Sequence, residues 1–188
     1  MCEAAILILH NYTEMDDSYM NNIILIGMPA TGKSTVGVVL AKLMGYDFID
    51  TDILISNSQK KPLSQIIADV GYDAFIAIEG GVGAGLYCEK TVIATGGSMV
   101  FSESAMANLR ALGTLVWLDT PVEELECRVT GSLEDRGVAT PSKMGFREIY
   151  EQRRPLYEKY ADVRLSCKGN AEEVVSTLRM MLSEETEN

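Results

Sequence analysis

Short apolar runs alternate with amphipathic helical patterns along most of the chain. Strands are expected at 23–26, at a segment ending in Phe48 and Ile49, and at 91–94, 114–119 and 162–166. Helices are expected at 33–44, 63–88, 103–111, 146–160 and 170–183, the second of them broken near Gly71 and again near Gly80–Gly85. This alternation predicts an α/β domain in which a parallel sheet is covered by helices.

The bulk composition is that of an ordinary globular protein, with 188 residues, 47% of them hydrophobic and 23% charged. The net charge of −11 argues against broad nucleic-acid or anionic-membrane binding, but it permits a local positive pocket for a small anion. The four cysteines are widely spaced, as expected of packing residues in a reducing cytoplasm. The single histidine, His10, argues against a histidine-based triad or a zinc site.

The first 19 residues contain a short apolar run without a basic start, and acidic residues follow it. This pattern fits neither a signal peptide nor a membrane span. We therefore expect an ill-ordered extension at 1–19, followed by one cytoplasmic domain at 20–188.

A phosphate-binding loop is predicted directly after the first strand. Gly27, Gly32, Lys33 and Ser34 fit the pattern G-x-x-x-x-G-K-[ST] between a strand and a helix. The glycines let backbone N–H groups surround a phosphate, Lys33 would reach the β- and γ-phosphates, and the Ser34 hydroxyl would face Mg²⁺. The loop indicates a nucleoside triphosphate with Mg²⁺, and it does not by itself separate a kinase from a GTPase or a motor. No guanine-reading N-K-x-D stretch is present, which argues against a GTPase.

Two carboxylates end the second strand, at Asp50 and Asp52. Ligands of open α/β sheets bind at this edge, and residues two apart in an extended segment project to the same side. One carboxylate could hold Mg²⁺ through water while the other accepts a proton from an attacking hydroxyl. The glycines of 95–97, after the third strand, would allow close approach of a ligand, although a plain turn explains them equally well.

The polar stretch 128–145 interrupts the helical pattern and is long for a loop inside a compact domain. Arg136 lies within it, as expected of a lid arginine that closes over a transferring phosphate. Arg153 and Arg154 lie side by side on the following predicted helix, and a solvated charged face is the default interpretation of such a pair.

Taken in order, these motifs resemble the shikimate kinase family. The resemblance covers 22–183 and rests on "GMPATGKST", "DTD" at 50–52, "TGG" at 95–97, "RG" at 136–137 and "RRPLY" at 153–157. It implies a P-loop kinase fold, a three-layer α/β/α sandwich with a five-stranded parallel sheet. A small helical substrate-binding region at about 53–90 and a lid at about 129–145 are implied as well.

The resemblance also implies a phosphotransferase of aromatic amino-acid biosynthesis that uses ATP and Mg²⁺ to phosphorylate shikimate. We expect it to act as a monomer on a small hydroxy-carboxylate, without nucleic-acid or membrane partners. The implied catalytic residues are Asp52 as base, Lys33 and the lid arginine Arg136. Ser34 and Asp50 are the implied metal ligands. The implied nucleotide-binding residues are Gly27, Met28, Pro29, Ala30, Thr31, Gly32, Lys33, Ser34, Thr35 and Arg128. The implied substrate-binding residues are Asp52, Ile76, Glu79, Gly96, Gly97 and Arg153, the last holding the substrate carboxylate.

Three positions depart from the family pattern. Ile76 stands where the family normally has an arginine that helps to bind the shikimate carboxylate, Ser98 replaces a third glycine, and Val129 replaces an arginine that packs on adenine, although Arg128 is adjacent. Loss of a charge-assisted partner costs about 1.5–3 kcal/mol. A shikimate-specific site is therefore not expected to dispense with the arginine freely.

The departures leave two alternatives. Glu79 shares a helix face with Ile76 and would lack the missing arginine as a partner, so it could instead receive a substrate ammonium. Homoserine or a similar hydroxy amino acid would then be the acceptor. A nucleotide-sensing binding module without efficient catalysis is the second alternative, against which the presence of Asp52, Arg136 and Arg153 argues.

Overall fold

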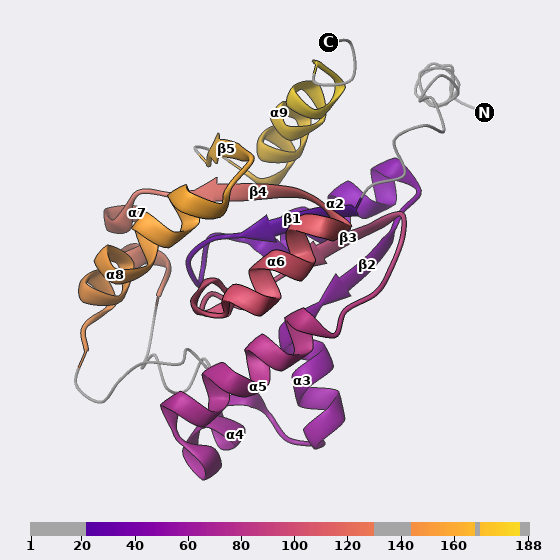
Figure 1. Ribbon diagram of the computed structural model, residues 1–188. Helices are drawn as coiled ribbons and strands as arrows, with labels where there is room; N and C mark the ends of the chain where they lie inside the picture. The colour runs from indigo at the N-terminus through magenta and orange to yellow at the C-terminus, as the bar shows by residue number, and fades with distance from the viewer. Residues whose placement is uncertain (1–21, 130–143, 168–169, 185–188) are drawn as a thin grey trace.

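The computed structural model describes residues 22–129, 144–167 and 170–184. Five parallel strands form one sheet in the order β2-β3-β1-β4-β5 (Figure 1). The strands are β1 (Asn22–Ile26), β2 (Asp47–Asp50), β3 (Thr91–Ala94), β4 (Gly113–Asp119) and β5 (Val163–Ser166). The expected α/β fold with a five-stranded parallel sheet is confirmed.

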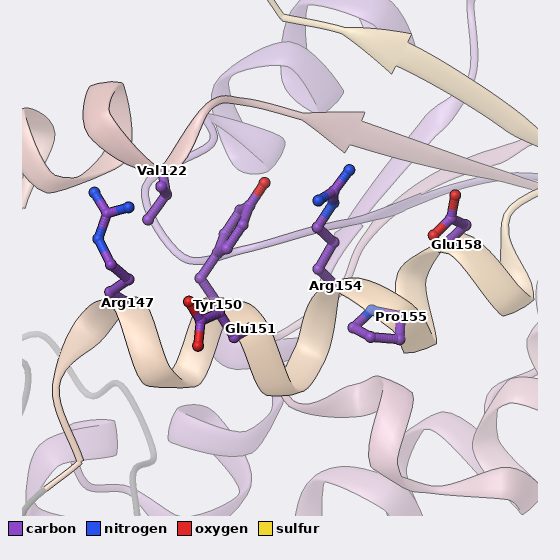
Figure 2. Close-up of a pocket in the computed structure, with 7 residues that line it drawn as sticks. All are labelled: Val122, Arg147, Tyr150, Glu151, Arg154, Pro155 and Glu158. Carbon is purple, nitrogen blue, oxygen red and sulfur yellow. The ribbon is translucent and has the colours of Figure 1, made fainter.

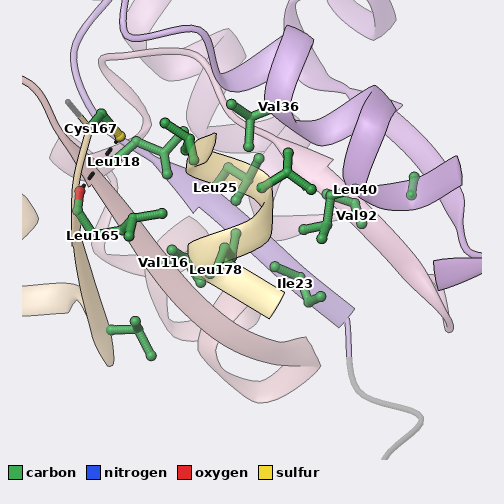
Figure 3. Packing of buried hydrophobic residues seen from close by; sticks show 14 residues of the cluster. Ile23, Leu25, Val36, Leu40, Val92, Val116, Leu118, Leu165, Cys167 and Leu178 are labelled. Atoms are coloured by element: carbon green, nitrogen blue, oxygen red, sulfur yellow. Dashed lines mark hydrogen bonds between the residues drawn. The ribbon is translucent and has the colours of Figure 1, made fainter. Parts of the chain in front are cut away.

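The two faces of the sheet are covered by different helices, as the alternation of side chains along a strand requires. Ile23 and Leu25 of β1 belong to a core that includes α2 (Lys33–Met44) and α9 (Ala171–Glu184), shown in Figure 3. Ile24 and Ile26 face the opposite core. That core is covered by the short 3₁₀ helix η1 (Met99–Phe101), α6 (Glu103–Leu112), α7 (Val122–Arg128) and α8 (Phe146–Tyr160).

A small helical unit, α3 (Thr51–Gln59), α4 (Leu63–Val70) and α5 (Tyr72–Ala84), lies beside the β2 edge of the sheet (Figure 1). Ile55, Ile66 and Phe75 form its separate apolar core. No helix in the ranges that the structure describes is long and apolar enough to cross a membrane.

Most of the expected elements agree with the structure, including the helix over 33–44 and the break at Gly71. The second expected break was wrong, because α5 continues through Gly80 and Gly83 to Ala84. A Cβ at Gly80 would lie 2.6 Å from Ser102 Oγ, and one at Gly83 would lie 2.8 Å from Ala105 Cβ. These glycines therefore allow α5 to pack closely on α6 instead of ending the helix.

Helix α3 was not predicted from the hydrophobic pattern. It begins directly after Asp50, whose carboxylate accepts hydrogen bonds from the backbone N–H groups of Asp52 and Ile53. Asp50 is thus an N-cap residue, a role that aspartate commonly takes.

Asn22 ties the beginning of the three central strands together. Its side-chain amide donates to the carbonyls of Cys88 at 2.8 Å and Leu112 at 3.0 Å, and its Oδ1 accepts from the Thr91 N–H at 3.0 Å. The residue is 2% exposed, so water cannot replace these bonds.

We predict that Asn22→Ala lowers the free energy of unfolding by about 3 kcal/mol, because it leaves buried backbone groups without partners. Urea unfolding measures the effect, and Asn57→Ala, at an exposed position of α3, is the matched control. Equal stability of the two variants would contradict the role of Asn22.

Candidate active site

The carboxyl ends of β1, β2 and β3 bring three segments together. The loop after β1 contains Gly27–Gly32, β2 ends at Asp50, and Gly96 and Gly97 follow β3. Helix α8 adds Arg153, whose guanidinium lies next to Gly97. The position agrees with the general rule for ligand sites in open parallel sheets.

The loop after β1 is folded around the ammonium group of Lys33. Lys33 Nζ donates to the carbonyls of Gly27 and Met28, both at 2.8 Å. The backbone φ is positive at Gly27 (143°), Ala30 (66°) and Gly32 (92°), and α2 begins at the next residue. Such a turn at a helix N-terminus directs N–H groups toward an anion. The loop therefore has the backbone shape expected of a phosphate-binding loop.

Arg128 also lies against this loop. Its guanidinium donates to the carbonyl of Ala30 at 3.3 Å and forms an ion pair with Glu124 at 2.5 Å. Arg128 is thus placed beside the predicted nucleotide site, whereas Arg136 lies outside the described residues.

The predicted metal ligands contact one another. Ser34 Oγ donates to Asp50 Oδ2 at 2.6 Å. Within the described ranges, no group of three or more His, Cys, Asp or Glu side chains is arranged to hold a metal. Mg²⁺ suits a sparser site, because it keeps several waters and binds phosphate oxygens together with one or two protein ligands. The hydroxyl and carboxylate present here fit that chemistry.

Asp50 and Asp52 do not remain on one extended segment, because α3 begins at Thr51. Asp50 contacts Ser34, whereas the carboxylate of Asp52 is directed to the backbone of Gly96. Both carboxylates still lie at the sheet edge, as the sequence predicts.

Gly96 is the point where two carboxyl groups converge. A Cβ at this residue would lie 2.7 Å from Asp52 Oδ1 and would overlap Glu79 Oε1. The Gly96 N–H donates to Thr51 Oγ1 at 2.9 Å, which fixes the loop to the start of α3. Glu79 is 1% exposed, and its Oε2 accepts a hydrogen bond from the Ser98 hydroxyl. The close approach requires glycine at position 96.

Arg153 and Arg154 have opposite environments, so the interpretation of the pair as one solvated face is wrong for Arg153. Arg153 is 1% exposed, its Nη1 would lie 3.0 Å from a Cβ at Gly97, and its guanidinium carbon is 5.6 Å from the centroid of the Phe101 ring. Arg154 is exposed. Only the first of the two belongs to the site.

The outer face of α8 lines a separate groove of about 330 Å³ (Figure 2). Figure 2 shows Arg154 there with Arg147 and Tyr150 on the same side of the helix. Arg147 forms ion pairs with Glu123 and Glu126 of α7 at 3.2 and 2.8 Å. This surface joins α8 to α7 and does not contribute to the site at Gly96.

Ile76, one turn before Glu79 on α5, packs against the apolar core formed by Ile55, Ile66 and Phe75. Its side chain offers no hydrogen bond or charge to Glu79. A hydrogen bond to Glu79 comes instead from the hydroxyl of Ser98, in the loop after β3.

Burial shifts the pKa values of three groups toward neutrality. The pKa of Asp52 is raised to about 6 by burial and by the neighbouring Asp50, against the opposing effect of Lys33. Burial raises the pKa of Glu79 to about 7, although the hydrogen bond from Ser98 lowers it. Burial likewise lowers the pKa of Lys33 to about 8. The site can therefore exchange protons near neutral pH.

Sequence reasoning did not assign the roles of Thr51, Ser98 and Tyr157. Each acts through a contact between segments that are distant in the chain, so no local spacing identifies it. Of the residues that the sequence assigned to the site, the structure brings together at this sheet edge Lys33, Ser34, Asp50, Asp52, Glu79, Gly96, Gly97 and Arg153.

Tyr157 anchors α8 to the glycine loop. Its hydroxyl donates to the Gly97 carbonyl at 2.5 Å, and its ring stacks on Trp117 with 6.1 Å between the centroids. Burial raises the pKa of Tyr157, so its hydroxyl keeps its proton at neutral pH. Arg153 lies one turn away on the same helix, and the Tyr157 contact therefore fixes its position.

We predict that Tyr157→Phe lowers the free energy of unfolding by about 1–2 kcal/mol, because the Gly97 carbonyl loses its buried donor. Denaturant unfolding tests this, with Tyr160→Phe on the same helix as the control. A loss in the control as large as that in Tyr157→Phe would contradict the specific role of the Gly97 contact.

Comparison with known proteins places this geometry in a family. The family model for shikimate kinase matches residues 29–183. The chain is 39% identical over 155 residues to a shikimate kinase from Nostoc, covering 81% of this chain and 83% of that protein. It is 36% identical to a shikimate kinase from Clostridium botulinum, covering 85% of this chain and 94% of that protein.

A solved structure supports the same assignment. The shikimate kinase from Acinetobacter baumannii in complex with shikimate superposes with a TM-score of 0.75 and 26% identity, covering 88% of this chain and 95% of that chain. The family model spans more than half of the sequence, and the relatives match it over most of their own length. The chain therefore belongs to the shikimate kinase family.

Proposed function

We propose that the protein transfers the γ-phosphoryl group of ATP to a hydroxyl group of shikimate. The observation that carries the proposal is the convergence of Asp52 and Glu79 on Gly96, next to the phosphate loop and to Arg153. Family membership and the shikimate-bound relative support the choice of acceptor. The acidic composition agrees with a small-molecule acceptor, and we propose that the protein is a cytoplasmic monomer.

In this proposal, Asp52 is the base that accepts the proton of the attacking hydroxyl, since its buried carboxylate has a pKa of about 6. Lys33 and the N–H groups of the loop neutralise the charge on the β- and γ-phosphates. Arg153 binds the acceptor carboxylate, because its guanidinium lies next to Gly97 of the same loop. Charge neutralisation and orientation then supply most of the rate enhancement.

We propose that Ser34 and Asp50 hold Mg²⁺ when ATP binds. The ion would neutralise phosphate charge, as it does in phosphoryl transfer generally. Asp50 also caps α3, so this ligand is held by the backbone N–H groups of Asp52 and Ile53.

Arg136 is proposed as the lid arginine and Arg128 as a residue of the nucleotide site. Arg128 is supported by its contact with the loop carbonyl of Ala30. The role of Arg136 rests on the family resemblance and on its place in the polar stretch 128–145. Ile76 is proposed to lie at the edge of the acceptor site, and this proposal rests on the family resemblance alone.

The proposed activity is tested by ADP release with ATP and Mg²⁺ against shikimate, homoserine and other small hydroxy acids. We expect acceptor-dependent turnover with shikimate. Turnover with homoserine but not with shikimate would show that the acceptor is a hydroxy amino acid, and Glu79 would then be the site for its ammonium group. No acceptor-dependent turnover would favour a nucleotide-binding module.

We predict that kcat/KM for the acceptor rises with pH through about 6, because Asp52 must lose its proton before it can act as a base. Below that pH the protonated carboxyl cannot accept the hydroxyl proton, so the rate falls. Asp52→Asn should reduce kcat by about 100- to 10,000-fold.

A pH–rate profile of the wild-type protein and of the matched variant Asp73→Asn measures this effect. Asp73 is exposed in the first turn of α5, so its variant should keep both the rate and the profile. Full activity of Asp52→Asn would rule out Asp52 as the base.

A further inference from the structure

Ser98 follows Gly96 and Gly97 in the loop after β3. Its backbone conformation does not require glycine. Its φ of −99° and ψ of −1° are accessible to any L-residue. The residue is 4% exposed and begins the turn that continues into η1, where its carbonyl accepts the Phe101 N–H at 3.0 Å. A side chain at this position is therefore directed into the protein, without strain in the backbone.

The Ser98 hydroxyl donates to one carboxyl oxygen of Glu79, and the geometry fixes the other oxygen. Oε2 of Glu79 accepts from Ser98, while Oε1 lies against Gly96, where it would overlap a Cβ at that residue. Asp52 Oδ1 is directed to the same side of Gly96. A hydrogen bond at Oε2 thus sets the position of Oε1, the carboxyl oxygen that lies beside Asp52 at Gly96.

Glu79 has no cation from its own helix at the preceding turn, because Ile76 occupies that position and packs into an apolar core. The charged groups that act on Glu79 come from other elements: Asp52 from α3, Arg153 from α8 and Lys33 from α2. Asp52 disfavours the charged form of Glu79, and the two cations favour it. The Ser98 hydroxyl, in the loop after β3, forms a direct hydrogen bond with the same carboxyl group.

We propose that Ser98 is a positioning residue of the acceptor site, whose hydroxyl holds the Glu79 carboxyl so that Oε1 faces the acceptor beside Asp52. The inference rests on the proposed function in so far as Gly96 lines the acceptor site. Ser98 itself does not touch the acceptor. It acts through Glu79, and it takes the place of a donor from α5.

Two variants remove the hydroxyl in different ways. Ser98→Ala keeps most of the volume, and Ser98→Gly also removes the β-carbon, whereas Ser98→Thr keeps the hydroxyl. We expect KM for the acceptor to rise about tenfold in Ser98→Ala and Ser98→Gly. This factor corresponds to the lower end of the range of free energies that hydrogen bonds to charged groups contribute. KM for ATP should remain within about twofold, and Ser98→Thr should recover most of the affinity.

The matched control is Ser58→Ala, at an exposed serine of α3 whose hydroxyl donates to the Ile55 carbonyl. It should leave both KM values unchanged. A parallel rise of both KM values in Ser98→Ala, together with lower stability, would assign Ser98 a purely structural role and overturn the proposal.

A second readout does not depend on activity. The Ser98 hydrogen bond lowers the pKa of Glu79, so its loss in Ser98→Ala should raise that pKa above the wild-type value of about 7. NMR titration of the glutamate side-chain carboxyl carbons measures the shift, with Glu79→Gln identifying the signal.

An unchanged Glu79 pKa in Ser98→Ala would overturn the inference whichever acceptor the protein uses. Absence of wild-type turnover with shikimate would instead defeat the proposed acceptor, while the titration would still decide whether Ser98 controls Glu79. A raised pKa with unchanged acceptor KM would show that the hydrogen bond exists but does not position an acceptor group, and it would also overturn the proposal.

Discussion

Burial of charge at the carboxyl ends of β1, β2 and β3 is the constraint on which the rest of the site depends. Lys33, Glu79 and Arg153 are each at most 8% exposed, and Asp52 lies among them. An isolated charge in such a place would cost several kcal/mol, so each group must be compensated by another charge or by hydrogen bonds. The loop carbonyls around Lys33 and the hydroxyl beside Glu79 provide this compensation.

This compensation requires backbone segments to approach one another more closely than side chains would allow. Gly96 admits the two carboxyl groups, and Gly97 lies between Pro29 and Arg153. Gly80 and Gly83 bring α5 against α6 and η1, and the same helix carries Glu79 into the site. The positions of the charged groups therefore follow from the packing of small residues around them.

Much of this arrangement can be predicted from the sequence, because it depends on local patterns. The Gly27–Ser34 motif requires only a strand before it and a helix after it, and both are visible in the periodicity of apolar residues. Asp50 ends β2, and Asp52 and Gly96 lie two residues beyond strand ends, so the topology of a parallel sheet brings them to one edge. Arg153 could be placed from the family resemblance alone.

The rest depends on contacts between distant segments. The glycines of α5 read as a helix break, since their packing against α6 has no local signal. The hydroxyls of Ser98 and Tyr157 contact residues 19 and 60 positions away. The pattern of α5 alone likewise gives Glu79 no donor, because Ser98, which donates to it, lies in the loop after β3.

The choice of a hydroxyl as the partner of Glu79 has a consequence for charge balance. Asp50, Asp52 and Glu79 together carry one more charge than Lys33 and Arg153 when all are ionised, and burial raises the pKa values of both Asp52 and Glu79. An arginine is a donor only, and it would favour the ionised carboxylate. A serine hydroxyl can donate to the carboxylate or accept from the protonated acid, so it satisfies Glu79 in either state. The Ser98 hydroxyl can therefore stay hydrogen-bonded to Glu79 whether or not the carboxyl group carries a proton.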